Sequence, residues 1–193
     1  MKSIPLALAL VASFALVACG GDNDQMGAVG TEPGAADTAT GTDGMNAEAP
    51  DTDFLEQAMT SGMKEVQVSQ LAQERASNAQ VKAFAERMVQ DHQQANDQLQ
   101  QIVTQHGWNP SPDRDAINDA RQELEDKTGA DFDTAYMDMM VSDHEDAVGL
   151  LEDKVDDMEA NPDVRRWATD TVPTLRDHLQ QAQSIQKALN ATH

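Results

Sequence analysis

The sequence predicts an all-α fold: a bundle of four long helices, with one short helix in the connection between the second and the third. In four long segments, apolar residues recur at the spacing of one helix face. Asn, Gly and Pro residues separate these segments, as expected where helices end and begin. The chain holds 10 Met but only 4% aromatic residues, which is typical of a helical core built from flexible side chains.

The first two helices are expected to form an antiparallel hairpin because the break between them is short. The first helix is predicted over residues 53–76, and its buried face includes Glu65. Asn78 can cap the second helix, which is predicted to run to His106. Gly107 then provides a left-handed terminator.

The second half of the chain contains one short and two long predicted helices. The short helix is expected over residues 113–127, with Gly129 marking its end. The third long helix is predicted over residues 131–160, with Met158 facing inward, and the last over residues 162–190.

The length of the middle connection leaves the topology of the bundle open. A short helix of about 15 residues covers ~22 Å, and eight extended residues add at most ~28 Å. A 28-residue helix is ~42 Å long. The connection can therefore cross the full bundle, but nothing in the sequence forces it to do so.

Charge excludes several classes of function. With 13 Lys+Arg against 34 Asp+Glu, the formal charge is −21. Such a chain would be repelled by nucleic-acid phosphates and would not dock on anionic lipid through basic residues. We expect no nucleic-acid partner, whereas cationic partners and metal ions remain compatible with this charge.

The N-terminal region predicts export and lipid attachment. Residues 1–18 have a positive start and an apolar run too short to span a bilayer comfortably, as in a signal peptide. The run ends in Leu-Val-Ala followed by Cys19, which resembles the lipobox of bacterial lipoproteins. That resemblance implies a lipidated Cys19 and attachment to a membrane. Gly20 at the next position favours the outer membrane, with the domain in the periplasm.

A tether is predicted between the lipid and the bundle. Residues 19–52 are rich in Gly, Ala, Thr, Asp and Pro and show no apolar periodicity. Such a composition cannot bury enough apolar surface to offset its conformational entropy, so we expect a disordered acidic segment. The folded domain is then residues 53–193.

One polar side chain lies near the middle of the buried face of each long helix. These four residues are Glu65, His92, His144 and His178, and we call them the Glu–His layer. Mid-helix positions meet at the middle of a bundle whichever way its helices point. Three imidazoles and one carboxylate suit a first-row transition metal such as zinc, iron, manganese or copper.

An aspartate precedes each of these histidines, at Asp91, Asp143 and Asp177. Each lies about 100° around the helix axis from its histidine. We expect these carboxylates to reach the imidazoles of neighbouring helices and hold one ring nitrogen, which leaves the other free to bind a metal. A metal-free cluster of protonated histidines paired with these acids is the alternative.

The chain shows no catalytic motif. Whether it is an enzyme stays open, but the lack of such a motif argues against an enzyme. Two-metal carboxylate sites use Glu-x-x-His on two helices. Here the residues three before each histidine are Val89, Val141 and Leu175. This spacing argues against that chemistry.

Several segments resemble a bacterial family of exported ferritin-like proteins, catalogued as domain of unknown function 4142. The similarity rests on the residues around the Glu–His layer, notably residues 81–92, 132–136 and 173–179. It covers about residues 54–189 and implies a ferritin-like bundle outside the cytoplasm. The family pattern includes all four residues of the Glu–His layer, but the resemblance implies no established activity.

Three functions remain open from the sequence. The first is a lipid-anchored envelope protein that binds a transition metal in the Glu–His layer. The second is a metal-free interaction or stress-related module whose His/Asp cluster responds to pH. The third, by fold analogy alone, is a ferritin-like redox enzyme.

Overall fold

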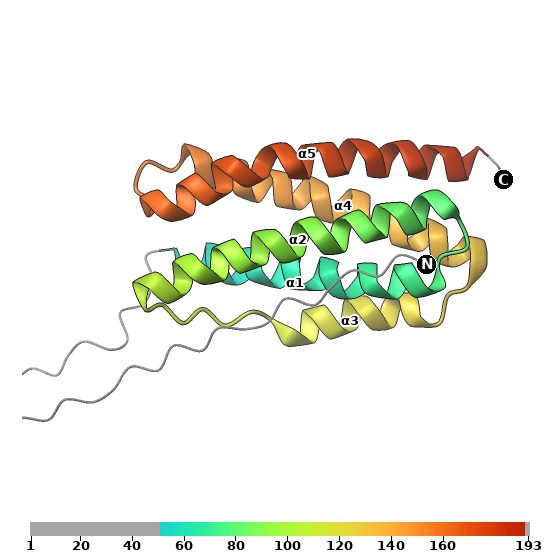
Figure 1. The fold of residues 1–193 in the computed structure, drawn as a ribbon, viewed down its shortest axis with the longest axis horizontal. Coiled ribbons are helices and arrows are strands. Elements are labelled where there is room, and N and C mark those ends of the chain that lie inside the picture. The colour runs from blue at the N-terminus through green and yellow to red at the C-terminus, as the bar shows by residue number, and fades with distance from the viewer. Residues whose placement is uncertain (1–50, 192–193) are drawn as a thin grey trace, which may run out of the picture. The chain divides into compact units, whose positions relative to one another are not determined.

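The computed structural model describes residues 51–191, and every regular element in this part of the chain is an α-helix (Figure 1). The five helices are α1 (Thr52–Arg75), α2 (Ala79–His106), α3 (Arg114–Glu125), α4 (Gly129–Asp156) and α5 (Pro162–Asn190). The predicted all-α bundle with a short helix before the third long one is confirmed. The predicted signal peptide, Cys19 and nearly all of the tether lie outside the described residues.

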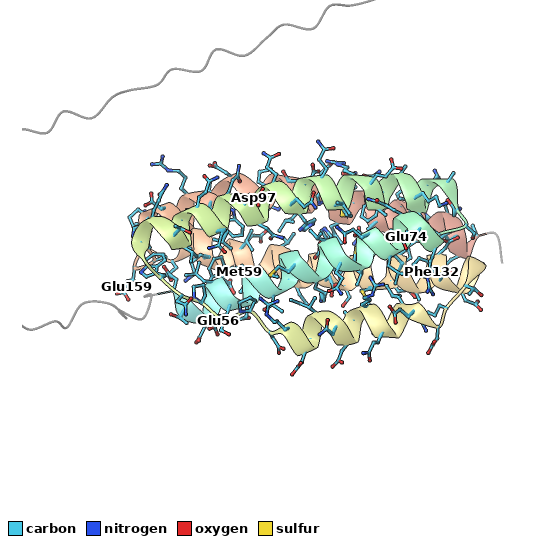
Figure 2. The ribbon with its side chains drawn as sticks, turned by 60° about the horizontal axis from the view of Figure 1, so that its bottom comes forward. Glu56, Met59, Glu74, Asp97, Phe132 and Glu159 are labelled. Carbon is cyan, nitrogen blue, oxygen red and sulfur yellow. The ribbon has the colours of Figure 1, made fainter. Side chains whose placement is uncertain are left out.

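Contacts at the two ends show that α1 and α4 run in opposite directions. Before α1, Asp51 accepts hydrogen bonds from Lys154 near the end of α4 and from the backbone of Asn161. At the opposite end, Asp133 in the first turn of α4 accepts from the backbone of Ser77 and Asn78, between α1 and α2. Figure 2 shows the same pairing of ends.

The middle connection crosses the whole bundle. Near the start of α1, its backbone at Ser111 donates to Glu56 and its backbone at Asp113 donates to Thr60. At the far end of α1, Arg75 donates to the carbonyl of Glu125, the last residue of α3. As a result α2 and α4 run in the same direction, and α3 packs on the outside of α1 and α4 (Figure 1). The structure thus settles the topology that the sequence left open.

The predicted helix signals of the first hairpin are present in the structure. The side chain of Asn78 accepts from the backbone N–H groups of Gln80 and Val81, which otherwise lack a partner in the first turn. Gly107 adopts a left-handed φ of 68° and ends α2.

The predicted limits of α3 hold to within two residues, whereas α4 begins two residues and ends four residues before its predicted limits. Gly129, expected to end the short helix, instead begins α4 with a φ of 58°. At the other end α4 stops at Asp156, because Asp157 is extended and its side chain accepts from the backbone of Glu159. The chain therefore turns before Met158, which is 80% exposed rather than inward.

The Glu–His layer divides the core into two apolar clusters. On each long helix, one set of buried apolar residues precedes the layer residue and another follows it. Phe84, Met88 and Met140 belong to the cluster on one side, and Leu99 and Leu151 to the cluster on the other. Apolar packing on both sides thus holds the four polar side chains at one depth. Within residues 51–191, no helix is long and apolar enough to cross a membrane.

Candidate metal centre

The four residues of the Glu–His layer meet in the interior of the bundle. The centroid of each imidazole ring lies 5.4–5.5 Å from the centroids of the other two rings. One nitrogen of each ring lies within 4.8 Å of one nitrogen of each other ring. Glu65 Oε2 lies 2.7 Å from His92 Nε2 and 3.5 Å from His144 Nε2. The predicted convergence of one acid and three imidazoles is therefore a feature of the fold.

Hydrogen bonds on the outer edges of two rings assign their tautomers. Nδ1 of His144 lies 2.8 Å from the carbonyl oxygen of Met140, which can only accept, so this nitrogen carries the proton. Nε2 of His178 lies 2.8 Å from a carboxylate oxygen of Asp91 and likewise donates. In the neutral rings, Nε2 of His144 and Nδ1 of His178 therefore present lone pairs toward the centre.

The distances between these inward atoms fit ligands of a shared ion. Nε2 of His144 lies 3.4 Å from Nδ1 of His178 and 3.5 Å from the Glu65 carboxylate. Two ligands held at about 2.0–2.1 Å from zinc with a tetrahedral angle lie roughly 3.4 Å apart. The contact of 2.7 Å between Glu65 and His92 is shorter than this spacing.

Several of these polar atoms have no hydrogen-bond partner in the protein. Both carboxylate oxygens of Glu65 and Nε2 of His92 are buried without one, although Glu65 and His92 are close. The distance and the missing bond are compatible, because the ring N–H does not point at the oxygen. A buried polar group without a partner costs about 1–3 kcal/mol, and more if it is charged. A cation bound between Glu65 and His92 would give each of these two side chains a partner.

In the absence of metal, the electrostatics of the layer favour a negative Glu65 beside a positive His92. Burial raises the pKa of Glu65, but His92 and His144 outweigh this effect and lower it to about 2. Burial lowers the pKa of His92, yet the carboxylate of Glu65 leaves it above its usual value. Burial and repulsion from the other two histidines lower the pKa of His178 to about 4, despite its bond to Asp91. His92 is therefore inclined to carry a proton against Glu65, whereas His178 is not.

Only one of the three aspartates expected to bond an imidazole does so within the described residues. Asp91 of α2 holds His178 of the neighbouring helix α5, as the sequence predicts. Asp143 instead bonds Lys64 of α1 at 2.8 Å, and Asp177 pairs with Arg87 at 2.7 Å on the surface. The prediction for these two residues was wrong, because a basic side chain occupies the position where each carboxylate faces the next helix.

Two contacts beside the layer were not expected from the sequence. The carbonyl of Met140, one turn before His144, fixes that ring within its own helix. The spacing of four residues could have suggested this bond. The hydroxyls of Ser69 and Tyr136 meet at 2.8 Å in the buried interior, one turn beyond Glu65. No pattern in the sequence pairs these two residues, since they come from α1 and α4.

Comparisons with known proteins give a family and a fold but no activity. No curated protein matches the chain. A solved structure, described as the crystal structure of a DUF305 fragment from Deinococcus radiodurans, is similar with a TM-score of 0.64 and 16% sequence identity. The alignment covers 74% of this chain and 99% of that one, and at this identity it shows a shared fold alone. The model of a domain of unknown function, DUF4142, matches residues 35–185, so this chain belongs to the DUF4142 family.

Proposed function

We propose that this protein binds one first-row transition-metal ion in the Glu–His layer. The observation that carries the proposal is the meeting of three buried imidazoles, close enough to share one ion, with the carboxylate of Glu65. Both oxygens of Glu65 and Nε2 of His92 also lack a hydrogen-bond partner among the described residues. Three nitrogen ligands and one oxygen ligand would give a four-coordinate site of the kind that zinc adopts. Imidazole and carboxylate together also suit iron, manganese and copper.

The surroundings of the site support tight binding of a divalent cation. The lowered pKa of Glu65 provides a carboxylate anion at neutral pH. The lowered pKa of His178 keeps that ring neutral, which a ligand must be. Asp91 and the Met140 carbonyl orient two rings from outside, as such partners do in known metal sites.

Equilibrium dialysis of the full chain tests the proposal. The purified protein is stripped with a chelator, dialysed against zinc, iron(II), manganese or copper in turn, and its metal content is measured by plasma mass spectrometry. We expect one ion per chain in the wild type and none in His144→Ala. His106→Ala is the matched control, since His106 lies at the end of α2 in an exposed pair with Asp163 and should leave the content unchanged. No bound metal in the wild type would contradict the proposal and favour the metal-free His92–Glu65 ion pair instead.

We also propose that the bundle is held at a membrane of the cell envelope through a lipid on Cys19. The support is the Leu-Val-Ala-Cys sequence at the end of an apolar leader, followed by an acidic segment without Lys or Arg. Mass spectrometry of the intact mature chain is expected to show cleavage before Cys19 and a diacylglyceryl group. The variant Cys19→Ser should move the protein from the membrane to the soluble fraction. An unmodified Cys19 in the membrane fraction would contradict this assignment.

A further inference from the structure

His92 differs from the other two histidines of the layer on its outer edge. The outer nitrogens of His144 and His178 bond protein atoms, whereas within residues 51–191 no hydrogen bond is made to Nδ1 of His92. His92 is 6% exposed, while the other two rings are completely buried. His92 also lines a cavity of about 30 Å³ between the long helices. This volume holds one or two water molecules, so His92 is the ring nearest to solvent.

On the side of α1 and α2, the side chain of Asn96 lies between this cavity and the surface. Asn96, one turn after His92 on α2, lines the inner cavity and also a groove of about 240 Å³ on the outside of α1 and α2. Its amide occupies the notch left by Gly62 on α1: a Cβ at Gly62 would lie 2.0 Å from Oδ1 of Asn96. The amide thus closes the seam between α1 and α2, above His92.

Ion pairs with a basic residue lie across the other three seams between neighbouring long helices. Lys64 bonds Asp143 between α1 and α4. Arg87 pairs with Asp177 between α2 and α5. Arg176 pairs with Glu152 between α4 and α5. A cation that approaches along any of these seams meets a positive side chain, and its passage requires an ion pair to open.

The groove outside Asn96 carries no basic residue. Its polar side chains are three glutamines and Asp97, which Figure 2 labels on α2. Amide and carboxylate oxygens are ligands that divalent cations accept while they lose water. An acidic groove between α1, α3 and α4 also borders the inner cavity, at Ser61 and Leu150, but two basic residues, Lys64 and Lys127, line it. The seam between α1 and α2 is the one that combines an acidic groove free of basic residues with a neutral closure.

We propose that a hydrated divalent metal ion reaches the Glu–His layer through this seam, and that the amide of Asn96 is the gate. The amide swings out of the Gly62 notch, its oxygen contacts the ion, and His92 receives it from the inner cavity. This inference rests on the metal site proposed above. It assigns to Asn96 and Gly62 a role in the rate of binding, not in its strength.

Rapid mixing of the full chain with zinc tests the gate. Zinc uptake is followed by competition with a chromogenic chelator, and release by dilution into excess chelator. We expect Asn96→Ala to speed both rates by about tenfold, equivalent to a barrier lowered by roughly 1.4 kcal/mol. Asn96→Leu, which fills the notch without an oxygen, should slow both. Because the gate touches only the path, the dissociation constant should stay the same in both variants.

The control variant and the wild type separate the possible failures. Arg176→Ala removes an exposed ion pair from the seam between α4 and α5 and should leave both rates unchanged. Unchanged rates in both Asn96 variants of a chain that binds zinc would overturn the gate alone. Faster exchange in Arg176→Ala would place the route at the other seam and also overturn it. A shifted dissociation constant with parallel loss of structure by circular dichroism would assign Asn96 to packing and overturn the proposal. Absence of zinc uptake by the wild type would overturn the metal site itself.

Discussion

Nε2 of His144 lies 3.4 Å from Nδ1 of His178, and in the neutral rings both nitrogens present lone pairs to each other. The proton of each ring is already used on the outside, by the carbonyl of Met140 and by Asp91. Two lone pairs at this distance repel unless a cation or an extra proton lies between them. The arrangement is therefore costly without a bound ion, and binding energy from that ion would offset the cost.

Metal should stabilise the fold only when the layer is intact. At a zinc concentration of 100 times the dissociation constant, linkage adds about 2.7 kcal/mol to the free energy of unfolding. We expect the unfolding temperature of the wild type and of His106→Ala to rise on zinc addition. His144→Ala should show no rise, and calorimetry of all three proteins with and without chelator measures the difference. An equal rise in His144→Ala would show that zinc binds elsewhere.

Replacement of Asp91 should weaken metal binding, whereas replacement of Asp177 on the surface should not. Replacement of a carboxylate that orients a ligating histidine weakens metal binding by about 10- to 100-fold. We expect this loss for Asp91→Asn in a zinc competition titration. Asp177→Asn breaks a surface pair with Arg87, 56% exposed at the carboxylate, and should leave affinity nearly unchanged. Equal effects of the two variants would contradict the role given to Asp91.

Tyr136 gives a pH dependence that can be observed directly. Burial raises the pKa of this phenol, and the bond to Ser69 offsets this only in part. The folded state therefore keeps the neutral form, while the unfolded chain ionises near the ordinary value of 10.0. Stability is fully present below pH 10 and should fall as pH rises above it, because the unfolded state then releases a proton.

The chain has a single tyrosine, so its phenolate absorbance reports Tyr136 alone. In an alkaline titration we expect this absorbance to rise together with the loss of helical circular dichroism. Ionisation near pH 10 in a chain that is still fully helical would contradict the buried environment of Tyr136.

Asp133 should stabilise the start of α2 from a different helix. Its carboxylate is 1% exposed and accepts from the backbone of Ser77 and Asn78 and from the Ser77 hydroxyl. Removal leaves these donors without a partner, so Asp133→Ala should lower the free energy of unfolding by about 2–3 kcal/mol. Asp138→Ala, on the exposed side of the same helix, is the control and should change it by less than about 0.5 kcal/mol. Urea denaturation of both variants checks the difference, and equal losses would contradict it.

The sequence predicted the Glu–His layer because helical periodicity alone places one polar residue in each buried stripe. Glu65 and His144 lie on the inward face of their helices whatever the connections are. The partners of Asp143 and Asp177 could not be predicted in the same way. Each aspartate faces sideways, so its partner depends on which helix is next to it and on the rotation of that helix. Only the fold brings Lys64 opposite Asp143.

The limits of α4 show a second kind of error. Apolar residues continue at helical spacing through Met158, so the sequence predicts a third long helix that includes this residue. The stop comes from a local hydrogen bond, in which Asp157 accepts from the backbone of Glu159. Such a bond competes with the backbone hydrogen bonds of the helix, but it does not change the spacing of apolar residues in the sequence. The contact of Asn96 with Gly62 could not be predicted for a related reason, since it depends on the missing side chain of Gly62 on the neighbouring helix.

X-ray absorption spectroscopy of the zinc-loaded full chain identifies the atoms that bind the metal. We expect one zinc per chain, bound by three imidazole nitrogens at about 2.0–2.1 Å and one carboxylate oxygen at about 2.0–2.2 Å. His92→Ala should lose one of the imidazole contributions. A first shell made only of oxygen, or one unchanged in His92→Ala, would contradict the claim that these four residues form the site.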